Sequence, residues 1–165
     1  MSGAAKGRPL WAPFILLATA IVVSDQVAKA WITDALAPDR AIDVVGDYLR
    51  LVYTQNTGAL FGLFRGQAAP FAVLSLAVIG FIVVYHGRSG RSPYMTLTLG
   101  LLLGGAIGNA IDRLRLNYVV DFVDAGIGDL RFYTFNVADS CITAAILLLL
   151  LMAVRPTLAE PRRDG

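Results

Sequence analysis

The sequence contains one cysteine and one histidine, and this scarcity excludes several kinds of chemistry. Cys141 alone cannot form an intramolecular disulfide. A thiol nucleophile at Cys141 would need a neighbouring base, and His86 lies in a different apolar stretch. With one histidine and scattered carboxylates, the chain also lacks the clustered ligands of a metal site. We therefore expect no metal, no cofactor and a packing role for Cys141.

The chain also carries little net charge, because 14 lysines and arginines are balanced by 12 acidic residues for a formal charge of +2. Nucleic-acid-binding proteins usually show a clear basic excess, so no nucleic-acid partner is expected. Hydrophobic residues, by contrast, make up 56% of the sequence. The mean hydropathy of +0.64 indicates a membrane protein rather than an ordinary globular domain.

Four apolar stretches reach or approach the length of a membrane span: residues 10–32, 68–85, 94–116 and 135–154. A helical span needs roughly 20 apolar residues to cross the hydrocarbon core, so four spans use most of the chain. We expect a mainly α membrane protein built as a four-transmembrane-helix bundle. A single polytopic membrane domain over residues 1–165 leaves no room for a separate soluble domain.

The placement of charge predicts the orientation of the spans. Basic residues precede the first stretch, separate the second from the third and follow the fourth: Lys6, Arg8, Arg88, Arg91, Arg155, Arg162 and Arg163. The other side is mostly acidic, with Asp34, Asp39, Asp43, Asp47, Asp124 and Asp129. By the positive-inside rule, both termini are expected in the cytoplasm and the acidic side is expected to face outward.

The segments on the outer side show strand patterns. Residues 41–45 and 48–53 are β-branched and partly alternating around a Gly46-Asp47 turn, which predicts a hairpin. Residues 118–123 and 130–134 predict a second strand pair around a turn at 126–129. Residues 56–64 are short and amphiphilic, and we expect them to form an interfacial helix. These segments together predict a small β platform and a short interfacial helix on the outer, extracytoplasmic face.

Polar residues form three stripes at helical spacing, all toward the outer ends of the spans. They are Asp25 and Lys29 in the first span, Asn109, Asp112 and Arg113 in the third, and Asn136, Asp139 and Thr143 in the fourth. Residues three or four apart share a helix face. The three spans are therefore expected to surround one polar pocket.

Two interpretations of these stripes are open. Asp25 with Lys29, and Asp112 with Arg113, could simply be ion pairs that hold the bundle together, with the asparagines bonding between helices. Asp121 and Asp139, however, have no basic neighbour at helical spacing. A carboxylate at the end of a span is costly and so indicates a functional site. Two of them suggest a pair that shares one proton, as in aspartic proteases.

Five motifs occur in order along the chain: Asp25-Gln26-Val27-Ala28-Lys29, Asn56-Thr57-Gly58-Ala59, Gly108-Asn109 with Asp112-Arg113, Val120-Asp121-Phe122 and Phe135-Asn136-Val137-Ala138-Asp139-Ser140. This set resembles that of bacterial lipoprotein signal peptidase, the signal peptidase II family, over residues 25–143. The resemblance implies an intramembrane aspartic endopeptidase of the bacterial cell inner membrane. It also implies a diacylglyceryl-modified prolipoprotein substrate, cleaved just before the lipidated lipobox cysteine.

Carried over residue by residue, the resemblance implies that Asp121 and Asp139 are catalytic. It implies substrate-binding or supporting roles for Asn56, Gly58, Asn109, Asp112, Arg113, Asn136, Asp25 and Lys29. The partners that follow are the lipidated prolipoprotein and the surrounding membrane lipids. We expect the protein to act as a monomer.

Two other classes of function stay open on the residues alone. A small proton-coupled transporter would use intramembrane carboxylates as a proton relay. Such sites usually lie near the midplane between repeated halves, whereas these acids lie at the outer ends of spans in a chain without an internal repeat. A non-enzymatic membrane scaffold would leave the polar stripes without a purpose.

Overall fold

The structure is a computed structural model that describes residues 8–36, 40–57 and 68–160. The described helices are α1 (Trp11–Ala35), α2 (Ala68–Ser89), α3 (Pro93–Leu116), α4 (Val137–Val154) and the short 3-10 helix η2 (Pro156–Ala159). The strands are β1 (Ala41–Val45), β2 (Leu49–Asn56), β3 (Val119–Ile127) and β4 (Leu130–Arg131). Each of the four predicted spans is therefore helical.

Three of these helices, α1, α3 and α4, are long and apolar enough to cross a membrane. The helix α2 has 22 residues, but within the described ranges its apolar part is the shorter segment Val73–Ser89. The fold is thus that of a membrane protein with three long apolar helices and a small antiparallel sheet.

The helix boundaries lie close to the predicted ones, and local contacts explain the differences. The helix α4 starts at Val137 rather than at residue 135 because Asn136 caps it. Asn136 Oδ1 accepts from the Asp139 backbone N at 2.9 Å, and Asp139 Oδ2 accepts from the Asn136 backbone N at 3.3 Å. The helix α1 continues past residue 32 to Ala35, and α3 ends where Asn117 takes a left-handed conformation.

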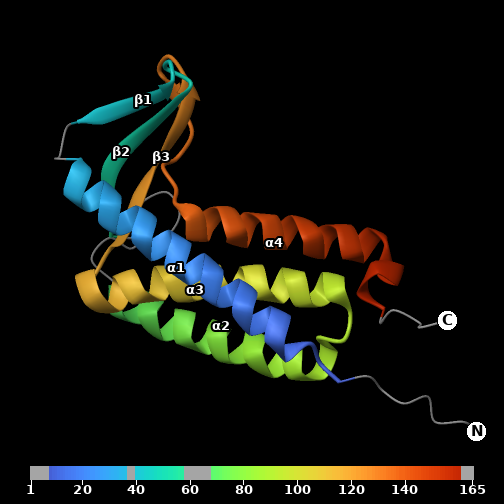
Figure 1. Ribbon diagram of the computed structural model, residues 1–165. Coiled ribbons are helices and arrows are strands. Elements are labelled where there is room, and N and C mark those ends of the chain that lie inside the picture. The colour runs from blue at the N-terminus through green and yellow to red at the C-terminus, as the bar shows by residue number, and fades with distance from the viewer. Residues whose placement is uncertain (1–7, 37–39, 58–67, 161–165) are drawn as a thin grey trace, which may run out of the picture.

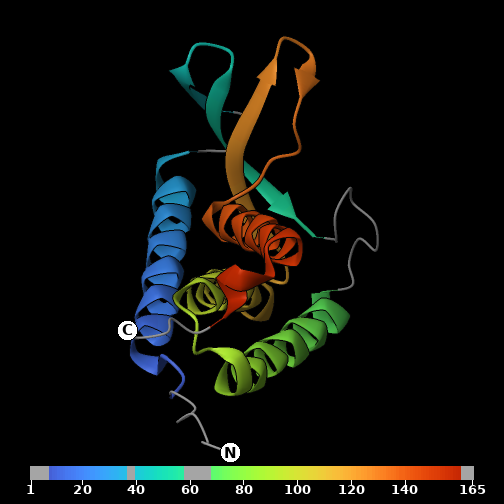
Figure 2. The ribbon, with the colours of Figure 1, turned by 90° about the vertical axis from the view of Figure 1, so that its right-hand side faces the viewer.

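The helix α3 lies at the centre of the bundle and contacts α1, α2 and α4 (Figure 2). Glycines allow this close packing. A Cβ added at Gly104 would lie 2.7 Å from the Ile21 Cβ, and one at Gly105 would lie 2.6 Å from the Ala138 carbonyl oxygen. Gly100, Gly104 and Gly108 recur every four residues, a spacing that lets a neighbouring helix approach closely. Gly105 lies outside this series, and it is the glycine that faces the Ala138 backbone of α4.

The two predicted hairpins join into one four-stranded antiparallel sheet in the order β1-β2-β3-β4. They join because β2 pairs with β3, which places Thr54 opposite Asp121. The second hairpin differs from its prediction, since β3 extends to Ile127 and β4 has only two residues. Gly128 makes the short turn between them with a φ of 54°, which favours glycine.

The sheet stands at the end of the bundle where α1 ends and α4 begins (Figure 1). Ile32 of α1 and Leu36, which caps the end of that helix, pack against Val120 and Phe122 of β3. This buried cluster fixes the sheet to the helices. The start of α1 and the end of α4 lie at the opposite end of the bundle. Of the predicted interfacial helix at 56–64, Asn56 is the last residue of β2, and residues 58–64 lie outside the described ranges.

Candidate active site

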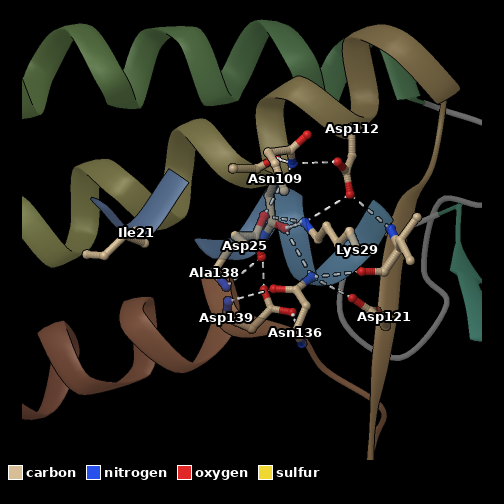
Figure 3. A network of polar contacts seen from close by, with 12 residues as sticks. Ile21, Asp25, Lys29, Asn109, Asp112, Asp121, Asn136, Ala138 and Asp139 are labelled. Carbon is tan, nitrogen blue, oxygen red and sulfur yellow. Dashed lines mark hydrogen bonds and ion pairs between the residues drawn. The ribbon is translucent and has the colours of Figure 1, made fainter. Parts of the chain in front are cut away.

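The two aspartates come from different elements that meet where the sheet joins the bundle (Figure 3). Asp121 is the third residue of β3 and is 1% exposed. Asp139 is half-buried in the first turn of α4, where the capping contacts with Asn136 hold it. The backbone pairing of β3 fixes the position of Asp121, and the capping box of α4 fixes the position of Asp139.

Asparagine amides surround both carboxylates. Asn136 Nδ2 donates to Asp121 Oδ1 at 2.7 Å, and Asn109 Nδ2 donates to Asp139 Oδ1 at 2.8 Å. Asn136 Nδ2 also lies 3.1 Å from Asn109 Oδ1, so the two amides are linked to each other. Asn56 Nδ2 donates to Asp121 Oδ2 at 3.0 Å. The structure thus brings three of the predicted asparagines onto the aspartate pair.

The surroundings of Asp121, which lies in a strand outside the helices, favour its protonated form. Burial raises the pKa of Asp121 to about 7, and the negative charge of Asp139 acts in the same direction. The hydrogen bonds from Asn56 and Asn136 and the charge of Lys29 lower that pKa, but they do not offset the burial. Near neutral pH, this pair of carboxyl groups can therefore hold a proton.

A buried ion-pair cluster lies beside the carboxyl pair. Lys29 Nζ lies 2.8 Å from Asp25 Oδ2 and 2.9 Å from Asp112 Oδ2, and all three residues are almost fully buried. The predicted pair of Asp25 with Lys29 is confirmed. The possible pair of Asp112 with Arg113 is wrong, because Asp112 turns toward α1 and meets Lys29 there.

Arg113 instead lies on the side of α3 near the carboxyl pair. Its Nη1 donates to the Asn109 carbonyl oxygen at 3.3 Å, and its guanidinium carbon lies 5.9 Å from the centre of the Phe71 ring. The charges of Asp139, Asp121 and Asp112 all act on it, although it makes no ion pair with Asp112. The positive charge of Arg113 therefore interacts with the carboxyl groups of the site.

Three further residues bear on the predicted site. The predicted role of Gly58 is untested, because this residue lies outside the described ranges. Thr143 is exposed, one turn beyond the polar network. Gln26 was missed, although its Nε2 donates to Asp112 Oδ1 at 2.9 Å and lies 3.3 Å from the Gly108 carbonyl oxygen. Its spacing of three from Lys29 was the available signal, since it places both side chains on one face of α1.

The single histidine belongs to the other end of the bundle. His86 is fully buried against Phe14 at the start of α1, with ring centres 3.8 Å apart, and its Nε2 faces Thr96. Cys141 is half-buried in α4. Within residues 8–36, 40–57 and 68–160, no three histidine, cysteine or acidic side chains gather in a way that could hold a metal ion.

Comparisons with known proteins identify the family of the chain. The family model described as Signal peptidase (SPase) II matches residues 17–155. The lipoprotein signal peptidase of Syntrophomonas wolfei is 38% identical over 152 residues, which cover 92% of this chain and 97% of that protein. That of Symbiobacterium thermophilum is 40% identical over 141 residues, with 85% and 93% covered.

Solved structures show the same fold. A bacterial membrane enzyme aligns with a TM-score of 0.85 and 27% identity, covering 96% of this chain and 97% of that one. A second bacterial membrane enzyme aligns with a TM-score of 0.82 and 28% identity, with 91% and 97% covered. The chain therefore belongs to the signal peptidase II family, whose members are proteases and whose named relatives here are bacterial lipoprotein signal peptidases.

Proposed function

We propose that Asp121 and Asp139 are the catalytic dyad of an intramembrane aspartic endopeptidase. The observation that carries this proposal is the pair of carboxyl groups bridged by the amides of Asn109 and Asn136. The raised pKa of Asp121, about 7, supports it because such a pair needs one protonated and one ionised member. Membership in a protease family favours this function over the transporter.

In this mechanism the ionised carboxylate takes a proton from a water molecule as that water attacks the scissile carbonyl carbon. The protonated carboxyl group donates a hydrogen bond to the carbonyl oxygen and stabilises the tetrahedral intermediate. A proton then passes to the amide nitrogen as the carbon–nitrogen bond breaks. The asparagine amides keep the two carboxyl groups in place throughout, so little reorganisation is needed.

The substrate follows from the relatives, which are named lipoprotein signal peptidases. We infer that this chain removes the signal peptide from diacylglyceryl-modified prolipoproteins and cleaves just before the lipidated lipobox cysteine. The two acyl chains of such a substrate stay in the bilayer, so a dyad at the end of the membrane helices can reach the bond next to them. In this proposal Asn56, Gly58 and Arg113 hold the substrate, and the enzyme acts as a monomer among membrane lipids.

The same proposal includes a membrane topology. The helix α2 is a fourth span, residues 56–64 form a helix in the membrane interface, and residues 1–165 form one membrane domain. The 22-residue length of α2 and its contact with α3 support the fourth span. The basic residues at the end opposite the dyad support cytoplasmic termini and a site that faces the outer side of the inner membrane.

Asp121→Asn and Asp139→Asn test the dyad. Each amide keeps the size of the side chain but cannot exchange a proton with water, so we expect cleavage to fall about a thousandfold or more. The assay uses a lipidated lipobox peptide and the same peptide without lipid, and only the lipidated one should be cut by the wild type. Asp129→Asn, on the exposed β3–β4 turn, is the matched control. A variant of either dyad residue that folds and cleaves normally contradicts the proposal.

A further inference from the structure

Lys29 uses all three of its donors on three different residues. Besides the contacts with Asp25 Oδ2 at 2.8 Å and Asp112 Oδ2 at 2.9 Å, its Nζ donates to Asn109 Oδ1 at 3.2 Å. An ammonium group has three donors and no acceptor. Lys29 is only 4% exposed, so its ammonium group is almost completely shielded from solvent. The three contacts therefore fix the position of Nζ.

Each of the two carboxylates also holds a backbone amide next to the proposed dyad. Asp25 Oδ1 accepts from the Ala138 backbone N at 3.0 Å. Asp112 Oδ2 accepts from the Val120 backbone N at 3.0 Å. Ala138 directly precedes Asp139, and Val120 directly precedes Asp121. Figure 3 shows the two arms that result, one from Lys29 through Asp25 to α4 and one through Asp112 to β3.

We propose that Lys29 is a positioning residue that sets the separation of the Asp121 and Asp139 carboxyl groups through these two arms. The inference rests on the proposed dyad and deepens it. A shift of Nζ would move the backbone on both sides at once, since each arm ends on the amide before a dyad residue. A misplacement of about 1 Å in an active site can cost about a hundredfold in rate.

The third contact of Lys29 orients an amide of the site. Because Lys29 can only donate, Asn109 must present its oxygen to Nζ. Its nitrogen then faces Asp139 Oδ1 at 2.8 Å. Gln26 Nε2 donates to the remaining oxygen of Asp112 and so keeps that carboxylate from rotating. Lys29 therefore fixes both the spacing of the carboxyl groups and the direction of a hydrogen bond to one of them.

Lys29→Met keeps a side chain of similar length and removes all three donors. We expect kcat for the lipidated peptide to fall about a hundredfold while KM stays within about threefold, because the change acts on the reacting groups and not on the lipid-binding surface. A non-cleavable peptide with a hydroxymethylene group in place of the scissile carbonyl imitates the tetrahedral state. Its affinity should fall in proportion to kcat.

Arg115→Met is the matched control, because Arg115 is an exposed cation that lines the same cavity of 380 Å³ between α1 and α3 as Lys29. It should keep wild-type kcat. A Lys29→Met enzyme with wild-type kcat overturns the inference. So does one whose KM worsens together with kcat, or one that binds the hydroxymethylene peptide as tightly as the wild type does.

Lys29→Met leaves two buried carboxylates without a counter-charge, which threatens folding. If its thermal transition is lost, the triple variant Asp25→Asn, Lys29→Met and Asp112→Asn replaces it, since it buries no charge and keeps an oxygen for each backbone amide. The same criteria apply to the triple variant.

Asp121→Asn, assayed in parallel, separates the two proposals. If Asp121→Asn cleaves, the dyad and this inference both fail, whereas an inactive Asp121→Asn beside a fully active Lys29 variant overturns this inference alone.

Discussion

Asn136 contacts both aspartates of the site, since its Nδ2 donates to Asp121 and its Oδ1 accepts from the backbone of Asp139. A single amide can do this because it carries a donor and an acceptor on opposite sides. An aspartate at position 136 would offer no donor and would add a third carboxylate. At the residue scale, the amides therefore hold in place the two carboxyl groups that would share a proton in the proposed dyad.

The pH dependence of cleavage should report the proton of this pair. Since burial raises the pKa of Asp121 to about 7, the protonated form is present below that pH and is lost above it. We expect kcat to fall as pH rises through about 7 to 8, by about tenfold per unit once the proton is lost. Asn56→Ala removes a hydrogen bond that lowers this pKa, so the alkaline fall should move to higher pH.

The control for that measurement is Gln55→Ala, the exposed neighbour on β2, whose side chain bonds to Tyr53. Its pH profile should match the wild type. A profile that stays in place in Asn56→Ala would show that Asp121 does not control the alkaline fall.

Arg113→Lys tests the cation beside the site. The ammonium keeps the charge but loses the planar fork of donors that suits carbonyl oxygens. Because Asp112 is engaged by Lys29, Arg113 has no ion pair with it to lose. We expect kcat/KM to fall about tenfold, on the scale of one misplaced hydrogen bond, with little change in melting temperature. Activity and stability that fall together, or that both stay unchanged, would indicate that Arg113 does not contact the substrate.

At the scale of elements, α3 brings α1 and α4 together because it has no side chains at the crossing points. A Cβ at Gly108 would lie 2.7 Å from Asp25 Oδ2 and 3.3 Å from the Ala138 Cβ, so it would press on both neighbours of this helix. The four-residue spacing of glycines predicted close packing. It did not identify the neighbour at each glycine, because a contact between helices depends on their relative rotation and depth.

Gly108→Ala and Gly100→Ala form a matched pair. At Gly100 the added Cβ would meet the end of the flexible Leu17 side chain at 2.9 Å, which can rotate away. At Gly108 it would displace the carboxylate of Asp25, which is held by Lys29 and Ala138. We expect Gly108→Ala to lose about 1–3 kcal/mol of stability and most of its cleavage activity, as overpacked sites do. Gly100→Ala should stay active, and equal behaviour of the two variants would contradict this account.

At the scale of the whole molecule, the two ends of the bundle have different compositions. The sheet stands at one end of the bundle (Figure 1), and the asparagines and buried carboxylates lie next to it. At the other end, where α1 begins, His86 packs against Phe14 and faces Thr96. Helical spacing predicted the stripes at the first end, since it depends only on local geometry. The choice of Lys29 rather than Arg113 as the partner of Asp112 depends on helix rotation, which spacing does not specify.

His86→Ala and Cys141→Ala test whether catalysis is confined to one end. Loss of the buried ring of His86 should lower stability by about 3 kcal/mol, as large-to-small changes do. Both variants should keep wild-type kcat at a temperature where they are folded, and chelators should have no effect. Folded Cys141→Ala with no activity would instead favour a thiol mechanism. A folded but inactive His86→Ala enzyme would show that catalysis also depends on the opposite end of the bundle.

The ion pair within α1 also has a consequence for biogenesis. Asp25 and Lys29 are four residues apart on one helix, so α1 can enter the bilayer with these charges already neutralised by each other. Asp112 arrives with α3, and the backbone amide that Asp25 finally holds, 113 residues away, arrives only with α4. Before α4 enters, a nascent chain would therefore lack Asp139 and with it one half of the proposed dyad. The two carboxyl groups of the proposed dyad would therefore meet only once α4 has entered the bilayer.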